Sequence, residues 1–350
     1  MYELETIALH AGEEPDPQTG ALRLPLHMAT SFKLPGFGRK LFDALLMESD
    51  RPPHAYTRWS NPTLRALEER MAALEGAGAT AVDTAAVATA TGMAAVSAIL
   101  LTFLGQGDHV IASEVCYAGS VELFGEHLPR LGIEVSLVDT SDVDQVRDAL
   151  RPETKLLYVE TPANPILRIA EIAAMAEVAH GAGALLVVDS TFAGPTLQRP
   201  LELGADIVVH SATKYLDGQG RCVGGVAVGR TEQMDEVLGF LRSCGPTMSP
   251  FNAWVFLKGL ETLRLRMEAH SRNALELALW LENRPEVEKV FYAGLPSHPE
   301  HALAKRQQSA FGGVLSFRVH GGREEAWQVI DATRLLSITA NLGDAKTTIV

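Results

Sequence analysis

The segment ADIVVHSATKYLDGQGRCVGG, Ala205–Gly225, joins an apolar run to a glycine-rich loop through one lysine. Residues 207–209 (Ile-Val-Val) predict a buried strand, and the small hydroxyl residues Ser211 and Thr213 follow it before Lys214. Desolvation at the end of a buried strand disfavours the ammonium form, so it lowers the pKa of a lysine there. Such a lysine can act as an amine nucleophile and form a Schiff base. A surface lysine that opens a loop is the commoner arrangement, so the rest of the chain has to decide between the two.

The composition is that of a globular protein. Of the 350 residues, 47% are apolar and 21% are charged, and a chain of this length can fold into two domains. The net charge of −13 argues against binding to nucleic acid or to an anionic membrane surface. The three cysteines have no metal-ligand spacing and are too few for a disulfide framework, which favours a reducing compartment. With no apolar core of a signal peptide at the N-terminus, we expect a cytoplasmic protein without a metal site.

Residues Ala85–Leu104 form a stretch of twenty uncharged residues, which is long enough in principle to span a membrane. Thr91 and Gly92 interrupt this stretch, and alanine and threonine dilute its first half. We therefore interpret it as a buried strand, a tight turn and a buried helix, and we expect no membrane partner.

Short apolar runs alternate with stretches of helical length from Ala86 onward, which predicts an α/β fold whose mostly parallel sheet is flanked by helices. The expected strands are Ala86–Ala90, His109–Ala112, Glu134–Val138, Lys155–Glu160, Ala184–Asp189, Ile207–His210 and Val223–Val228. The expected helices between them are Met93–Leu104, Ser120–Leu131, Val143–Leu150, Ile169–Ala182 and Leu197–Leu203. Ligands of such sheets bind beyond the carboxyl ends of the strands.

Polar residues cluster at those expected strand ends. Gly92 lies between a strand and a helix, where free backbone amides can bind a phosphate, although a tight turn alone also explains a glycine. Ser211 and Thr213 can donate hydrogen bonds to the same phosphate. Asp189 ends an apolar strand, either as a buried cap or as the partner of a protonated heteroaromatic nitrogen. Tyr117 opens a loop, where its ring either stacks on a planar cofactor or packs in the ordinary way.

The chain is expected to have three parts. Residues 1–55 are broken by prolines and glycines and predict an extended arm with one short helix near Leu41–Met47. Residues 56–245 form the α/β domain, whose first helix runs from Asn61 to Gly76. Residues 246–350 form a smaller α+β domain, which we expect to be incomplete because the chain stops inside an apolar run. Its expected elements are the helical stretches Phe251–Asn283, Ala302–Gln308 and Glu324–Leu336 and the strands Val287–Tyr292 and Val314–Val319.

A lysine, an aspartate, a phosphate-type turn and a stacking tyrosine together are what pyridoxal 5′-phosphate requires. Over essentially its whole length the sequence also resembles the Cys/Met-metabolism pyridoxal-phosphate enzymes. This family includes cystathionine synthases and lyases, methionine γ-lyase and O-acylhomoserine sulfhydrylases, and the resemblance implies the type I fold of PLP-dependent transferases. The motifs that carry it are YTRWSNPT (56–63), ATGM (90–93), VETPANP (159–165), VVDSTFAGP (187–195), DIVVHSATKYLDGQG (206–220), SPFNAWVFLKGLETLRLRM (249–267), GLPSHPEHALAKRQQSAFGG (294–313) and SITANLGDAKTT (337–348).

The resemblance implies a role for each matching residue. Lys214 would form the Schiff base with pyridoxal phosphate, Asp189 would keep the pyridine nitrogen protonated, and Tyr117 would stack on the ring. Asn164 would lie near the phenolic oxygen of the ring and Ser337 near the substrate carboxylate. The residues implied at the phosphate are Gly92, Met93, Ser211 and Thr213, together with Tyr56 and Arg58 reaching in from a neighbouring subunit. Active sites shared in this way imply a homotetramer built as a dimer of dimers.

Several stretches look most like the O-succinylhomoserine sulfhydrylase branch of the family: GQGRCVGG (218–225), FLRSCGPTMSPFNAW (240–254) and DATRLLSITANLGDAKTT (331–348). That likeness implies γ-replacement, in which sulfide displaces succinate from O-succinylhomoserine and gives homocysteine. Cystathionine γ-synthase and methionine or cystathionine γ-lyase activities are the alternatives. Methionine γ-lyases typically carry a cysteine two residues after the stacking tyrosine, where this chain has Gly119.

An alternative of another class is a chain that binds the cofactor but turns over little. Residues around Thr80–Ala86 are additional to the usual family pattern, and they could displace Gly92. The chain also ends at Val350, before the later arginine with which the family binds the substrate α-carboxylate.

Overall fold

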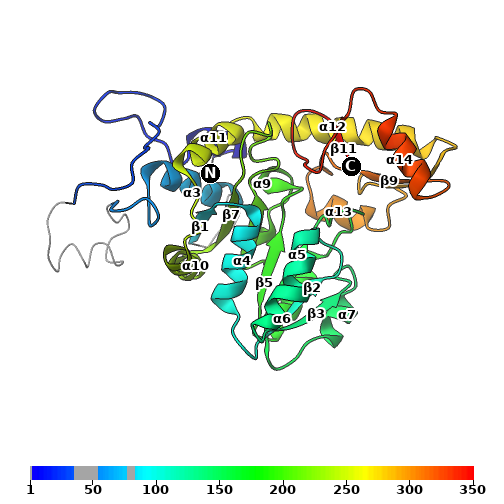
Figure 1. Cartoon of the computed structure of the whole chain (residues 1–350), viewed down its shortest axis with the longest axis horizontal. Coiled ribbons are helices and arrows are strands. Elements are labelled where there is room, and N and C mark those ends of the chain that lie inside the picture. Colours follow the sequence, from blue (N-terminus) through cyan, green and yellow to red (C-terminus); the bar gives the residue numbers. More distant parts are fainter. Residues whose placement is uncertain (1, 35–53, 77–82) are drawn as a thin grey trace.

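The computed structural model describes residues 2–34, 54–76 and 83–350 of the chain (Figure 1). At its centre is a seven-stranded sheet, and each expected strand is found within two residues of its predicted ends. The helix expected near Leu41–Met47 and residues 80–82 of the additional stretch lie outside the described residues. In sheet order the strands are β1 (Thr84–Thr89), β7 (Gly225–Arg230), β6 (Ile207–Ser211), β5 (Leu185–Asp189), β4 (Thr154–Glu160), β2 (His109–Ser113) and β3 (Glu134–Val138).

The sheet is mostly parallel, as predicted, with β7 running against both of its neighbours. β5 pairs in parallel with β4 and β6, whereas β7 is antiparallel to β6 and to the edge strand β1. The reversal follows from the connection, because only the loop 212–224 separates β6 from β7 and it contains no crossover helix. As a result the carboxyl ends of β1 and β6 lie at the same edge, on either side of β7.

Helices cover both faces of the sheet, because successive strand residues point to opposite faces. Residues such as Tyr158 and Val209 pack against the layer that contains α4 (Gly92–Phe103) and α10 (Thr231–Cys244). The opposite face is covered in two places: by α3 (Pro62–Glu75) and α11 (Pro250–Leu260) near β1, and by α7 (Val143–Asp148) and α8 (Ile172–Gly181) near β4. The shorter helical segments are α5 (Ala118–Glu122), η1 (Leu123–His127), α6 (Leu128–Arg130), α9 (Gly194–Leu197) and η2 (Pro200–Leu203).

The uncharged stretch Ala85–Leu104 forms β1 and α4, joined by a turn at Thr91. The Thr91 hydroxyl caps α4 by accepting the N–H of Ala94 at 2.9 Å. Across residues 2–34, 54–76 and 83–350, no helix combines the length and the apolarity needed to cross a membrane.

The beginning of the chain contains a helix that the prediction of an extended arm over residues 1–55 did not include. Leu4 and Ala8 of α1 (Leu4–His10) are buried against α3, and their spacing of four residues is the helical signal that the prediction overlooked. The chain after α1 is held by Arg70 of α3, whose buried guanidinium pairs with Glu13 at 3.2 Å. The described residues beyond that point project from the body on the side away from the C-terminal elements (Figure 1).

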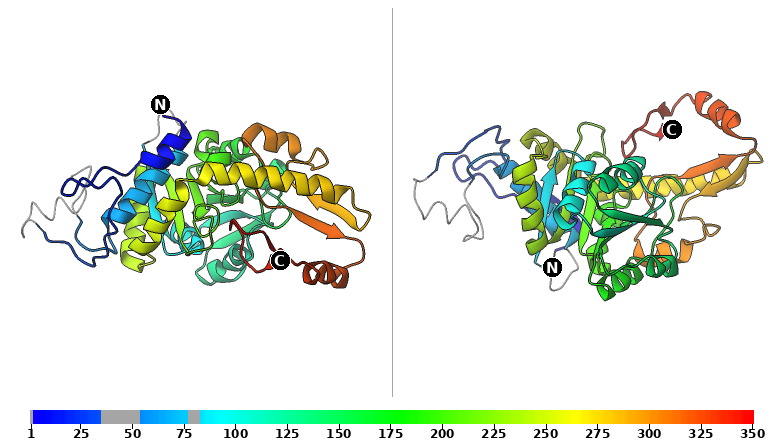
Figure 2. Two further views of the ribbon diagram at one scale, coloured as in Figure 1. Left: turned by 90° about the horizontal axis from the view of Figure 1, so that it is seen from above. Right: turned by 60° about the horizontal axis from the view of Figure 1, so that its bottom comes forward.

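The C-terminal part contains α12 (Leu263–Glu282), α13 (His301–Gln307), α14 (Arg323–Asp331) and the antiparallel pair β8 (Val287–Phe291) and β9 (Ser316–Val319). Figure 2 shows α12 running along the molecule from α11 towards β8 and β9. Two short strands, β10 (Ser337–Ile338) and β11 (Thr348–Ile349), then pair in parallel. The segment between them returns to the loop after β6, because the N–H of Ala345 donates to the carbonyl of Gly218 at 3.0 Å. Helix α10 was not predicted, and the long helical region after it is divided into α11 and α12.

Candidate active site

A cavity of about 360 Å³ lies at the carboxyl ends of the parallel strands, where ligands of such sheets bind. Eight of the candidate residues line it: Gly92, Met93, Tyr117, Asn164, Asp189, Ser211, Thr213 and Lys214. The other three, Tyr56, Arg58 and Ser337, are not among the lining residues. Its remaining lining residues are Thr91, Val96, Ser120, Glu160, Pro162, Thr191, Phe192 and Val223.

Lys214 follows β6 directly and carries the amine at the centre of the site. Its Nζ donates to Oδ1 of Asn341 at 2.6 Å, and burial lowers the pKa of Lys214 below its ordinary value. The segment that brings in Asn341 packs closely on the lysine, because a Cβ at Gly343 would lie 2.7 Å from the Lys214 carbonyl carbon. Asn341 was not predicted as a site residue, although the motif SITANLGDAKTT that contains it was recognised.

The turn between β1 and α4 gives the cavity an anion-binding edge. Gly92 begins α4, and because the N–H of Ala94 already donates to Thr91, the backbone amides of Gly92 and Met93 are the ones that can donate to a ligand. A Cβ at Gly92 would lie only 2.8 Å from Cβ of Ser211, which shows how closely the ends of β1 and β6 approach. Thr213 holds the loop beyond β6 by accepting the N–H of Gly224 at 3.1 Å. The additional residues before β1 therefore leave Gly92 beside Ser211.

Asp189 ends β5 and is almost fully buried in the cavity wall. The Tyr158 hydroxyl donates to its Oδ2 at 3.1 Å, and the N–H of Thr191 donates to its Oδ1 at 3.0 Å. Burial raises the pKa of Asp189 above its ordinary value, against the effect of these hydrogen bonds. A cationic N–H in the cavity would favour the ionised carboxylate, as a protonated pyridine nitrogen does.

Two loops complete the cavity wall on the side of β2 and β4. Tyr117 lies in the loop after β2 with its side chain 49% exposed, and Asn164 lies in the loop after β4. Glu160, at the end of β4, accepts the N–H of Tyr117 and the N–H of Asn164, each at 2.9 Å. Glu160 lines the cavity and was not predicted as a site residue, although it stands within the recognised motif VETPANP.

The family assignment comes from the whole chain. The family model of the Cys/Met metabolism PLP-dependent enzymes matches residues 5–350. The chain belongs to this family. It is 53% identical over 345 residues to the O-succinylhomoserine sulfhydrylase of Pseudomonas aeruginosa, covering 99% of this chain and 83% of that protein. It is 38% identical over 356 residues to an L-methionine gamma-lyase of Fusobacterium nucleatum, covering 99% and 86%. The crystal structure of metB from Corynebacterium glutamicum superposes with a TM-score of 0.91 at 39% identity, covering 99% of this chain and 86% of that one.

Family membership makes the protein a PLP-dependent enzyme, and its cavity fits pyridoxal phosphate. The amine of Lys214, the carboxyl of Asp189 and the helix N-terminus at Gly92 face one space. An amine, a carboxyl and a helix N-terminus are the kinds of group that can bind the aldehyde, the ring nitrogen and the phosphate of this cofactor. The space between Gly92 and Ser211 is one that a side chain at residue 92 would fill.

The remaining candidates lie in two other places. The guanidinium of Arg58 stacks over the Tyr56 ring at 5.4 Å, and the Arg58 carbonyl accepts the hydroxyl of Thr247 at 3.1 Å. Ser337 is exposed in β10, four residues before Asn341.

Proposed function

We propose that the protein catalyses γ-replacement on an O-acylhomoserine, with O-succinylhomoserine and sulfide as substrates and homocysteine and succinate as products. The observation that carries this proposal is the partly buried Lys214 amine, held by Asn341 in a cavity that also contains Asp189 and Gly92. Support for the acyl substrate is the 53% identity to the Pseudomonas aeruginosa sulfhydrylase.

Bound pyridoxal phosphate would supply an electron sink for the carbanion that forms on the substrate. Asp189 would hold the proton of the ring nitrogen, because an ionised carboxylate stabilises the N–H cation beside it. Lys214 would bind the cofactor and then move protons at Cα and Cβ of the substrate. The lowered pKa of Lys214 leaves a larger fraction of it as the free amine, which can accept a proton, and the hydrogen bond to Asn341 orients that amine. Succinate would leave with the electron pair of the Cγ–O bond, and sulfide would form the new Cγ–S bond.

Gly119 supports replacement over elimination. Dedicated methionine γ-lyases typically carry cysteine at this position. Here a Cβ at residue 119 would lie 2.7 Å from Cε1 of Tyr117, so the tyrosine ring occupies the space that a side chain would need. The Tyr117 ring is therefore placed in a way that a cysteine at position 119 would disturb.

We also propose that the enzyme is a cytoplasmic homotetramer in which subunits share active sites. Residues 1–55 would form the arm, residues 56–245 the cofactor-binding domain and residues 246–350 the smaller domain. Tyr56 and Arg58 would bind the cofactor phosphate of a neighbouring subunit, which fits their position outside the cavity of their own chain. Ser337 would lie near the substrate carboxylate.

Purified protein supplied with pyridoxal phosphate should be yellow, and borohydride should fix the cofactor on Lys214. O-succinylhomoserine with sulfide should then yield homocysteine, and Asp189→Ala should nearly abolish turnover while the protein still folds. A colourless protein would contradict the catalytic role of Lys214. Faster reaction with cysteine than with sulfide would indicate a cystathionine γ-synthase, and release of ammonia from methionine would indicate a lyase.

A further inference from the structure

Glu160 stands beside Asp189 at the carboxyl ends of two adjacent parallel strands. The two residues are paired in the register of β4 and β5. Glu160 is only 6% exposed, and in the described part of the chain no lysine, arginine or histidine forms an ion pair with it. A buried carboxyl without a cation is costly, so its contacts should show what keeps it there.

Each oxygen of Glu160 has a different backbone partner. Oε2 accepts the N–H of Tyr117 and Oε1 accepts the N–H of Asn164, both at 2.9 Å. These two residues belong to different loops, one after β2 and one after β4, and both line the cavity. A carboxyl group offers two acceptor oxygens at fixed separation, which no amide or hydroxyl side chain of similar length provides.

We propose that Glu160 is a positioning residue, which acts through Tyr117 and Asn164 to fix the orientation of the cofactor ring. The inference rests on the proposed assignment of Tyr117 to the ring face and of Asn164 to the phenolic oxygen. Glu160 itself joins the two loops from inside the wall, so that the two side chains keep a constant position relative to each other.

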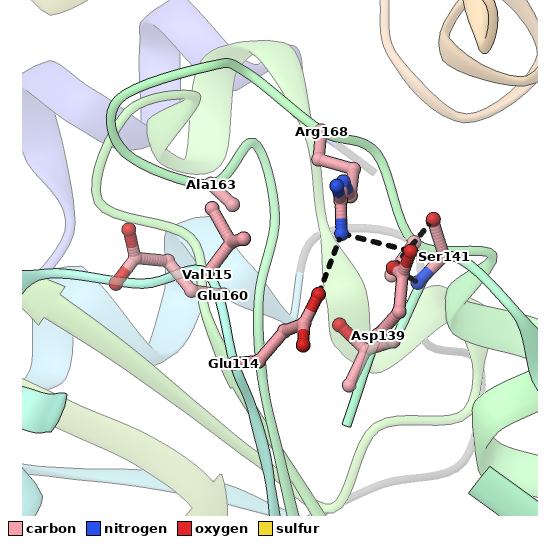
Figure 3. Close-up of a pocket in the computed structure, with 9 residues that line it drawn as sticks. Glu114, Val115, Asp139, Ser141, Glu160, Ala163 and Arg168 are labelled. Atoms are coloured by element: carbon pink, nitrogen blue, oxygen red, sulfur yellow. Dashed lines mark hydrogen bonds and ion pairs between the residues drawn. The ribbon is translucent and has the colours of Figure 1, made fainter. Parts of the chain in front are cut away.

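The outer side of the same wall is held by different groups (Figure 3). There Arg168 forms ion pairs with Glu114 at 3.2 Å and with Asp139 at 2.8 Å, while the Glu160 side chain points away from this cluster. Arg168 therefore joins the loops after β2, β3 and β4 without touching Glu160. This separation provides a control, because Glu114 lies three residues from Tyr117 but faces Arg168.

The surroundings of Glu160 are consistent with a role in positioning. Burial and the adjacent Asp189 raise the pKa of Glu160 to about 8, and the two backbone N–H groups oppose this shift. Cys116, in the loop after β2, and Tyr158 of β4 also lie close to this pair, and both are acidic groups. His210 of β6 lowers the pKa of Asp189, but Glu160 itself is influenced by Asp189 and the two backbone N–H groups. The Glu160 carboxyl therefore serves through its two acceptor oxygens.

The test compares Glu160→Gln with Glu114→Gln in the full-length enzyme. A glutamine can accept one of the two N–H groups but turns its own NH₂ towards the other, which leaves a buried donor unpaired. We expect the Kd of Glu160→Gln for pyridoxal phosphate to rise about tenfold. The visible circular dichroism per bound cofactor should fall by about half, since it reports ring orientation. Glu114→Gln should keep both values within about twofold of the wild type. If the two variants lose affinity and dichroism equally, or if Glu160→Gln loses neither, the inference is wrong.

Two further variants separate this inference from the proposed function. Glu160→Asp keeps the carboxyl group but shortens its reach, so we expect the same loss of dichroism even if Glu160→Gln does not fold. Wild-type dichroism in Glu160→Asp would overturn the inference. Tyr117→Ala and Asn164→Ala test the underlying assignment directly. If these two variants weaken cofactor binding while the Glu160 variants do not, the assignment of Tyr117 and Asn164 is supported and the positioning role of Glu160 is wrong. If they leave cofactor binding unchanged, the assignment of Tyr117 and Asn164 is wrong.

Discussion

Replacing Asn341 by aspartate places a carboxylate against the Lys214 amine with almost no change in side-chain size. The two groups are 2.6 Å apart in the wild type, where the neutral amide accepts a hydrogen bond without adding charge. A full charge pair at about 4 Å is worth about 4 kcal/mol at an effective dielectric constant of about 20. Lys214 is only partly buried, so solvent screening leaves roughly 1.4–2.7 kcal/mol, or about one to two pKa units.

Asn341→Asp should therefore raise the pKa of Lys214 and, at pH values below the wild-type pKa, reduce the fraction of free amine by about tenfold to a hundredfold. The rate at which cofactor-free protein combines with pyridoxal phosphate, followed by stopped-flow absorbance, should fall by the same factor and recover as the pH rises. Asn283→Asp is the matched control, because it introduces the same charge at an exposed residue at the end of α12. Wild-type rates for Asn341→Asp between pH 7 and 10 would refute the argument that a carboxylate at residue 341 raises the pKa of Lys214.

Three other changes probe the site and its support. Gly92→Ala puts a Cβ 2.8 Å from Cβ of Ser211, so the affinity for pyridoxal phosphate should fall about tenfold or more. A titration of cofactor-free protein measures this affinity. An unchanged affinity would mean that Gly92 is needed only for the turn between β1 and α4. Glu75→Gln alters the buried contact between Glu75 Oε1 and Nε2 of His210 in β6, which are 2.5 Å apart. This change should lower the free energy of unfolding in urea by about 1–3 kcal/mol. Equal stability would contradict a structural role for the pair. Burial lowers the pKa of Lys214, so in cofactor-free protein this amine should react with an acylating reagent at a lower pH than exposed lysines do. Peptide mass spectrometry can follow the acylation of each lysine as a function of pH. The same pH dependence for Lys214 and for exposed lysines would contradict this expectation.

The sheet and much of the cavity were predictable from local patterns. Asp189 and Lys214 each follow an apolar run, and parallel strands place their carboxyl ends at one edge, so their meeting in one cavity follows from the alternation of strands and helices. The reversal of β7 could be anticipated only from the short connection after β6, which has no room for a helix.

Contacts that depend on distant segments could not be predicted in this way. Asn341 reaches Lys214 because the chain after α14 returns to the sheet edge, and no local pattern records that return. Glu160 ends the expected strand Lys155–Glu160, but the two amides that donate to it come from separate loops, and no local pattern records that they point to one side chain. Helix α1 is a different case, since the spacing of Leu4 and Ala8 already indicates a helix before the prolines that follow it.

The reversed strand β7 also determines when the cavity can first exist during synthesis. β1 lies at the edge of the sheet and its neighbour is β7, with Thr84 opposite Arg230. A nascent chain that has emerged only through α4 therefore has no partner for β1, and the apolar helix stays uncovered. Gly92 and Ser211 can come together only once translation has passed Arg230, so the proposed phosphate site is incomplete on a shorter nascent chain. Pairing over so long a stretch of sequence is slow to form, so we expect the cofactor to bind after the sheet has assembled.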